Sequence, residues 1–226
     1  SNWTSGNFIT LKALGIGPGD EIITTPMSFI ATSNTIIHSG AKPVFVDVEE
    51  ETGNIDAGNI ESAITENTKA IMPVHLYGQM CDMNAINKIA DRYNLYIIED
   101  SAHCIEGQRD GIRPGQLSTA AVFSFYATKN ITSGEGGSIG TNDSGLYEKL
   151  LKYRLHGMNK GAAERHTSSY QHWDMELLGY KCNMSDIQAS LLLPQLKNIE
   201  IFMRAREELC MKYENAFFNI NGLIFP

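Results

Sequence analysis

The first hundred residues alternate between helical patterns and short apolar runs, with Gly, Pro and Asp residues between them. This alternation constrains the fold more than any other feature, because strands that alternate with helices form parallel sheets covered by helices. The chain is therefore predicted to be an α/β protein. The predicted strands are 21–25, 43–47, 70–74, 95–98, 120–125 and 137–140, and the predicted helices are 4–14, 29–38, 56–64, one capped by Asp82, and 146–155.

The last part of the chain reads differently. Apolar residues at helical spacing from Met184 to about Phe217 predict one long helix or two in succession, and Pro194 is expected to bend or break it. The polar stretch 159–171 is the candidate for a mobile loop. Both ends look cut, since the chain opens at a loop-to-helix junction and closes on an apolar segment.

Composition excludes several classes of function. A net charge of −8 without a Lys/Arg cluster argues against nucleic acid or an anionic membrane as the main partner. No apolar run approaches the roughly 20 residues that a membrane span needs. The four cysteines are widely separated and form no CxxC pair, so that neither a disulfide framework nor a zinc site is indicated. We expect reduced thiols, a cytoplasmic protein and no metal.

Two side chains at strand ends indicate an enzyme. Asp100 ends the apolar run 95–98, and Lys129 follows the run 120–125. A lysine amine can hold an aldehyde as a Schiff base, and a carboxylate can keep a pyridine nitrogen protonated, which are the two requirements of a pyridoxal phosphate enzyme. The competing interpretations are ordinary ones: Asp100 as a turn cap and Lys129 as a solvated surface charge.

Other residues fit the same cofactor. Thr4 and Ser5 open the first helix, where free N–H groups favour an anion, although such residues also cap helices that bind nothing. The Ser124 hydroxyl is suited to completing a phosphate site. His103 is expected beside the cofactor ring or as a structural hydrogen bonder, and Phe29 either stacks on the ring or packs in the core. The glycines at 134, 136 and 137 are expected to let backbone pack closely beside a ligand.

The chain resembles the DegT/DnrJ/EryC1/StrS sugar aminotransferases, which are pyridoxal phosphate enzymes of fold type I. The resemblance runs from Thr4 to about Leu196. It implies the large domain of that fold, a mixed, mostly parallel sheet of the seven-stranded type in an α/β/α sandwich. The segments that carry it are 14–21, 43–47, 73–78, 99–103, 124–130, 134–137 and 178–180.

The resemblance also implies a role for each candidate residue. Lys129 would form the Schiff base, Asp100 would bind the pyridine nitrogen, His103 would lie near the ring and Phe29 would stack on it. The phosphate would be held by Thr4, Ser5 and Ser124.

Three departures from the family pattern are visible. Trp3 stands where a small residue is usual, which predicts a bulkier phosphate loop. The segment that reaches the neighbouring subunit's phosphate is 179–183 here, so that contact belongs to Lys181 or Asn183. Family chains are longer, which implies a cofactor-binding domain at 1–196 and, at 197–226, a connecting helix and the start of a truncated small domain.

The implied reaction is transamination by a homodimer, from glutamate to a keto sugar carried on a nucleotide, in amino-sugar, deoxysugar or surface-polysaccharide biosynthesis. His103, Tyr126 and Trp173 are expected to border the sugar site, with core packing as the alternative for the two aromatic residues. A related sugar dehydrase is one rival, but in the family those enzymes replace the lysine. The other is a non-catalytic or regulatory protein that keeps the cofactor pocket.

Overall fold

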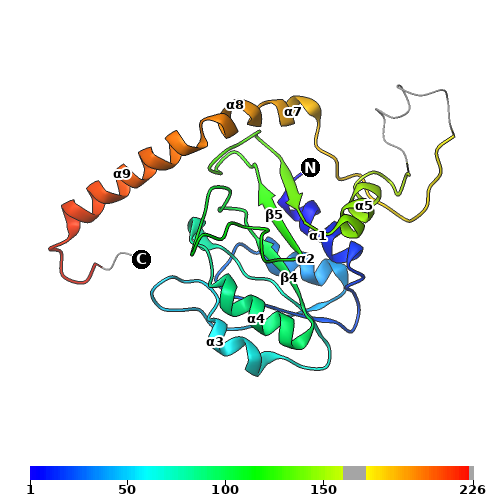
Figure 1. The fold of residues 1–226 in the computed structure, drawn as a ribbon, viewed down its shortest axis with the longest axis horizontal. Helices are drawn as coiled ribbons and strands as arrows, with labels where there is room; N and C mark the ends of the chain where they lie inside the picture. The colour runs from blue at the N-terminus through cyan, green and yellow to red at the C-terminus, as the bar shows by residue number, and fades with distance from the viewer. Residues whose placement is uncertain (160–171, 224–226) are drawn as a thin grey trace.

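A computed structural model describes residues 1–159 and 172–223. Its centre is one six-stranded sheet with the strand order β2-β1-β3-β4-β5-β6, in which neighbouring strands are parallel except β5 and β6 (Figure 1). The predicted mixed, mostly parallel sheet is confirmed, with six strands in the described residues where seven were expected. The strands are β1 (Glu21–Thr24), β2 (Lys42–Phe45), β3 (Thr68–Ile71), β4 (Tyr96–Asp100), β5 (Ala120–Ser124) and β6 (Gly137–Gly140).

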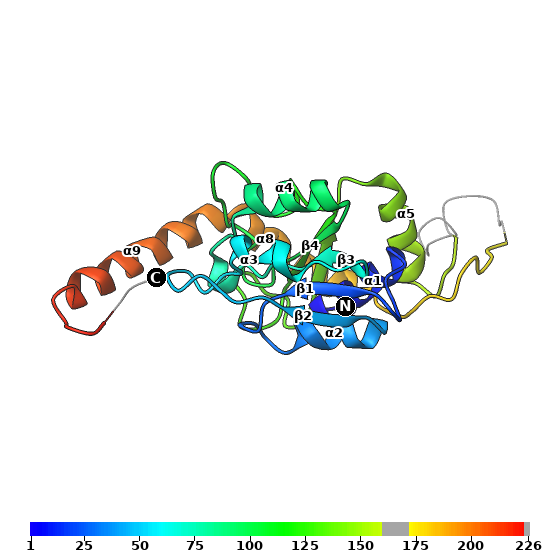
Figure 2. The same ribbon diagram turned by 90° about the horizontal axis from the view of Figure 1, so that it is seen from below.

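Helices cover both faces of this sheet, and Figure 2 shows α2 (Ala31–Ser39) and α4 (Met83–Tyr93) on opposite sides. Successive strand residues point to opposite faces. Ile23, Ile71 and Ile97 therefore pack against α4, whereas their neighbours along the strands pack against α1 (Trp3–Ala13) and α2. This alternation decides which way each functional side chain at a strand end points.

The remaining helices pack around this core or lead away from it. α5 (Ser144–Tyr153) packs beside α1, and α3 (Ala57–Ile60) continues into the short 3-10 turn η1 (Glu61–Ala63). A second 3-10 turn, η2 (Leu76–Gly78), follows β3. The predicted caps Asp56 and Asp82 are confirmed, because their side chains accept hydrogen bonds from Gly58 N and Ala85 N.

The C-terminal helical region differs from the prediction. It forms α7 (Asp186–Ser190), α8 (Leu192–Lys197) and α9 (Ile199–Phe217), and the breaks lie at Leu191 and Asn198. Pro194 lies within the first turn of α8, where its missing N–H needs no partner inside the helix. It is therefore not the break.

Helix α9 extends away from the sheet (Figure 1), and none of its residues is buried. Arg206 ties it back, because it donates to Glu106 Oε1 and to the Asn130 carbonyl, both at 2.8 Å, and Ile199 packs against a small core cluster at the start of the helix. The division of the chain at 196/197 stays a prediction. The predicted mobile loop lies outside the described residues except for Asn159. In the part of the chain that the structure describes, no helix has the length and apolar character to cross a bilayer.

The glycine-rich stretch after β5 packs closely against the protein itself, and its expected closeness to a ligand stays a prediction. A Cβ atom on Gly137 would lie 2.5 Å from the carbonyl carbon of Asn2, and one on Gly136 would meet Ser133 Oγ at 2.4 Å. Gly134 occupies a turn with φ 78°. The close approach at Gly137 is thus to the backbone that begins α1. It fixes where the first turn of that helix lies.

Replacing Gly137 with alanine should therefore destabilise the fold, because backbone atoms cannot move aside as a flexible side chain does. We expect a loss of about 1 to 3 kcal/mol in the free energy of unfolding, measured by urea denaturation. Gly140→Ala in the same strand is the matched control, since its added Cβ would come no closer than the Phe123 ring, at an ordinary contact distance of 3.6 Å. Equal stability of the two variants would contradict this assignment.

Candidate active site

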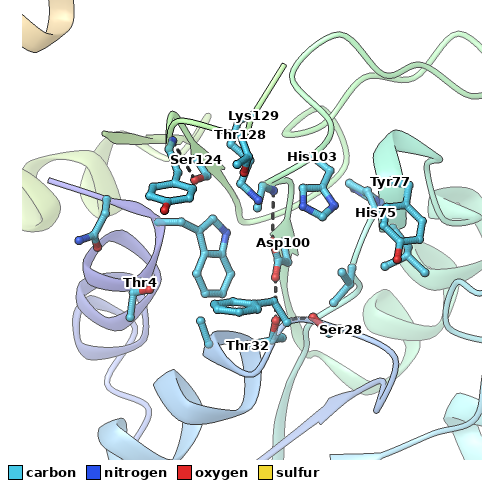
Figure 3. Close-up of a pocket in the computed structure, with 18 of the residues that line it drawn as sticks. Thr4, Ser28, Thr32, His75, Tyr77, Asp100, His103, Ser124, Thr128 and Lys129 are labelled. Carbon is cyan, nitrogen blue, oxygen red and sulfur yellow. Dashed lines mark hydrogen bonds between the residues drawn. The ribbon is translucent and has the colours of Figure 1, made fainter. Parts of the chain in front are cut away.

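A pocket of about 880 Å³ opens at the carboxyl ends of the parallel strands (Figure 3). Chain segments that follow β1, β3, β4 and β5 line it, together with the first turn of α1. Open α/β sheets bind ligands at this edge, because the strand ends and helix N-termini converge there. The lining residues are Asn2, Trp3, Thr4, Pro26, Met27, Ser28, Phe29, Ala31, Thr32, Val74, His75, Leu76, Tyr77, Asp100, Ala102, His103, Ser124, Tyr126, Thr128, Lys129 and Glu135.

Asp100 is the last residue of β4, and the residue is 6% exposed. Its backbone is held on one side by Pro73 and His75, through the bonds Asp100 N to Pro73 O at 2.9 Å and His75 N to Asp100 O at 3.1 Å. Its Oδ2 accepts from Thr32 Oγ1 at 2.8 Å, and its Oδ1 accepts from Ala102 N at 3.2 Å. The carboxyl group therefore has a fixed position at the floor of the pocket.

Burial dominates the electrostatics of this carboxyl group. Removal from water raises the pKa of Asp100 from its ordinary value of 3.8 to about 6, although the bonds from Thr32 and Ala102 and the charge of Lys129 act in the opposite direction. A buried carboxylate in this state favours a cationic partner. A pyridinium N–H is such a partner.

Lys129 and His103 face the same space (Figure 3). Partial burial lowers the pKa of Lys129, and the negative charge of Asp100 opposes that change. Burial also lowers the pKa of His103, and the nearby Lys129 lowers it further. The pocket thus holds an amine biased toward its neutral, nucleophilic form and an imidazole biased toward neutrality.

The first turn of α1 forms one wall of the pocket. Thr4 is exposed there and Ser124 lies among the lining residues. Within the described residues, the backbone N–H groups of Trp3 and Thr4 donate no hydrogen bond, and a helix N-terminus with free donors suits a phosphate group. Ser5 is placed otherwise, because it forms a capping box with Asn2 and does not line the pocket.

The remaining predicted residues divide into two groups. Phe29 and Tyr126 line the pocket with largely exposed rings, and the buried Trp3 contributes to its wall. Lys181, Asn183 and Trp173 are not lining residues. The assignment of Lys181 or Asn183 to a neighbouring subunit concerns a contact outside a single chain.

Several pocket residues escaped the prediction. Thr32 binds Asp100 and also contacts the Ser28 hydroxyl at 2.6 Å. The signal was present, because Ser28, Thr32 and Thr35 lie three or four residues apart and give this helical segment a polar face. Tyr77 also lines the pocket and stacks on His103. Its backbone conformation has no comparable signature in the sequence.

A buried pair supports the strand end from behind. Glu99 points to the opposite face from Asp100, where its Oε2 lies 2.6 Å from His75 Nε2. His75 Nδ1 accepts from Cys81 N at 3.2 Å, so the ring proton sits on Nε2 and is donated to Glu99. Glu99 Oε1 also accepts from Gly115 N at 2.7 Å and from the Ser118 hydroxyl. This network links the loops after β3 and β4.

The side chains present suit pyridoxal phosphate. The pocket combines a buried carboxyl group, a partly desolvated lysine amine, and hydroxyl and free N–H groups at a helix N-terminus. These match the ring nitrogen, the aldehyde and the phosphate of that cofactor. Within the described ranges, no three His, Cys, Asp or Glu side chains gather in an arrangement that would hold a metal ion.

Known proteins share this sequence and this fold. Residues 1–225 match the model of the DegT/DnrJ/EryC1/StrS aminotransferase family. The spore coat polysaccharide biosynthesis protein SpsC of Bacillus subtilis is 47% identical over 224 residues, and the GDP-perosamine synthase of Caulobacter vibrioides is 42% identical over the same length. The alignments cover 99% of this chain and 58% of each relative.

Solved structures agree with these alignments. The PLP form of the putative sugar aminotransferase Spr1654 from Streptococcus pneumoniae superposes with a TM-score of 0.86 at 32% identity, over 96% of this chain and 59% of that one. The chain thus spans a little over half the length of the relatives that it matches. By sequence and by fold, it belongs to the DegT/DnrJ/EryC1/StrS aminotransferase family.

Proposed function

We propose that the protein is a pyridoxal phosphate-dependent aminotransferase that moves an amino group from glutamate to a keto sugar carried on a nucleotide. One observation carries the proposal: Asp100 and Lys129 line a single pocket at the strand ends, close enough for the charge of each to shift the pKa of the other. A dehydrase of the same family type would not need Lys129. A protein that only binds the cofactor would not need its pKa lowered.

Each part of the pocket has a defined task in this reaction. When bound, pyridoxal phosphate supplies an electron sink for the carbon whose C–H bond is broken. Asp100 accepts a hydrogen bond from the ring nitrogen and keeps its proton there. Thr4, Ser124 and the free N–H groups of α1 bind the phosphate. Phe29 and His103 line the same pocket and would lie against the ring face and beside the ring.

Lys129 has two tasks. Its amine would hold the cofactor covalently until the amino group of the donor replaces it. The freed amine would then be the base that moves a proton away from and back to the reacting carbon atoms, a task that requires the neutral form favoured by partial burial. The lowered pKa thus serves both tasks.

The proposed sugar acceptor is supported by the names of the relatives. SpsC is described as a polysaccharide biosynthesis protein and the Caulobacter enzyme as a GDP-perosamine synthase, which points to a place in amino-sugar or surface-polysaccharide biosynthesis. A pocket of about 880 Å³ lies in the upper part of the usual range for ligand sites, roughly 300 to 1,000 Å³. Such a volume leaves room for a substrate beside the cofactor.

We also propose an active homodimer in which Lys181 or Asn183 completes the partner's phosphate site. Neither residue lines the pocket of its own chain. A cytoplasmic location is consistent with the four cysteines, all of which are unpaired.

The attachment residue can be tested directly. Borohydride reduction of the full-length protein with pyridoxal phosphate, followed by peptide mapping, should label Lys129, because its amine is partly desolvated and faces the buried carboxyl group. Lys129→Ala should abolish the label, whereas Lys12→Ala, on the far part of α1, should retain it. A label on any other lysine would disprove the assignment.

Asp100 should make the stability of the cofactor-free protein depend on pH. Its pKa is raised on folding. The contribution of Asp100 to the free energy of unfolding is therefore complete below about pH 4 and is lost as the pH rises through about 6. The rise in pKa from 3.8 to about 6 corresponds to a cost of roughly 3 kcal/mol for the charged carboxylate. Asp100→Asn avoids this cost, so it should be more stable than wild type by that amount above pH 6 but not at pH 4. Urea denaturation across this range measures it.

The exposed Asp91 provides the control, since Asp91→Asn should change stability by less than about 0.5 kcal/mol at every pH. If Asp100→Asn showed the same flat profile, the carboxyl group would not be buried in its charged form.

The substrate class can be tested by half-reactions. After glutamate has transferred its amino group to the full-length protein, nucleotide-linked keto sugars should restore the original absorption spectrum much faster than pyruvate or oxaloacetate. Binding of the nucleotide would orient the sugar carbonyl in the pocket. The comparison uses stopped-flow absorbance with GDP-, UDP- and dTDP-linked keto-hexoses. Equal rates with the small keto acids would remove the nucleotide-sugar assignment and leave the cofactor chemistry intact.

A further inference from the structure

Tyr77 combines backbone strain with exposure at the pocket rim. Its φ of 54° and ψ of 20° place it in the left-handed region, which is unfavourable for residues with a side chain. Its side chain is 77% exposed even though the ring is large and mostly apolar. Strain of this kind concentrates at functional sites, where the surrounding structure maintains it.

Contacts on every side hold this turn. His75 is anchored by its bond to Glu99, and Leu76 N donates to Asn54 Oδ1 at 3.1 Å. Gly78 N donates to the His75 carbonyl at 3.2 Å, and the Gly78 carbonyl accepts from Cys104 Sγ at 3.3 Å. The flanking residues are therefore fixed. They impose the left-handed conformation on the residue between them.

The ring of Tyr77 is oriented as well. It lies parallel to the imidazole of His103, with an angle of 3° between the planes and 5.9 Å between the centroids. In Figure 3 His103 lies between Asp100 and Tyr77, so Tyr77 stands on the outer side of the site. Phe29 and Tyr126 are two further exposed aromatic residues among the lining residues.

Neither the turn nor the core explains a tyrosine here. Glycine or asparagine would suit the left-handed conformation better, as Asn94 does with φ 53° at the end of α4. A residue that served core packing would be buried. The remaining role is contact with a ligand that enters the pocket beyond the cofactor.

We propose that Tyr77 binds the nucleotide-linked keto sugar through its ring face, and that it determines affinity for this substrate without acting on glutamate. The inference rests on the proposed function. A ring face backed by His103 recognises a flat or apolar surface, which is either the base of the nucleotide or the C–H face of the hexose. The strained turn presents that ring to the substrate.

Three variants of the full-length protein loaded with pyridoxal phosphate test this role. Tyr77→Gly removes the ring and relieves the strain, Tyr77→Ala removes the ring alone, and Tyr77→Phe keeps the ring face. Asn94→Gly is the matched control, because it changes another left-handed residue outside the pocket. Each is assayed in the glutamate half-reaction and in the half-reaction with GDP-, UDP- and dTDP-linked keto-hexoses. Binding of GDP, UDP and dTDP alone is measured by calorimetry.

We expect Tyr77→Gly and Tyr77→Ala to raise the apparent dissociation constant for the keto-sugar substrate roughly 5- to 150-fold, the range for loss of one aromatic stacking contact. The glutamate half-reaction should stay within about 2-fold of wild type. Tyr77→Phe and Asn94→Gly should behave as wild type, and Tyr77→Gly should melt within about 3 °C of it. Weaker binding of the free nucleotide identifies the base as the contact, whereas unchanged nucleotide binding identifies the sugar.

Other results would overturn the inference. Unchanged keto-sugar affinity in all three variants would exclude the contact. Equal slowing of both half-reactions would show that Tyr77 acts through His103 or the cofactor, and a change of oligomeric state in sedimentation would make it an interface residue. If wild type itself reacted with glutamate but with none of the keto sugars, the proposed substrate class would fail first, and the inference with it.

Discussion

The burial of the Asp100 carboxyl group is the constraint on which the rest of the site depends. A charged group at the end of an interior strand needs a cationic partner or a raised pKa, and here the pKa rises to about 6. The fold holds the group in place through Thr32, Ala102 and the backbone of the strand's neighbours. The pocket is therefore preorganised for a ligand that brings a cationic N–H.

Strand alternation allows two carboxylates to serve different purposes side by side. Asp100 points toward α2 and the pocket, while Glu99 points to the other face and binds His75. The first is left with an unfavourable charge that a ligand would relieve. The second is satisfied by protein donors and holds the loop that ends in the strained Tyr77. One strand end thus positions both the floor and the rim of the pocket.

Sequence patterns were sufficient for the sheet and for the principal site residues. Apolar runs mark the strands, and polar residues after these runs mark the edge at which Asp100, Ser124 and Lys129 line one pocket, while their roles toward the cofactor stay predictions. Tertiary contacts escaped the prediction. The conformation of Tyr77 depends on the contacts of its neighbours with Asn54 and Cys104, far along the chain, which periodicity does not report. The helix breaks at Leu191 and Asn198, in place of one at Pro194, also have no periodic signal.

The central claim is that Asp100 keeps a proton on the ring nitrogen of bound pyridoxal phosphate. The most direct measurement is the ¹⁵N NMR chemical shift of that nitrogen, with ¹⁵N-labelled cofactor bound to the full-length protein at pH 7 to 8. Wild type should show the shift of a protonated pyridinium, and Asp100→Asn the shift of a neutral pyridine. An unprotonated nitrogen in wild type, or identical shifts in the two proteins, would contradict the account.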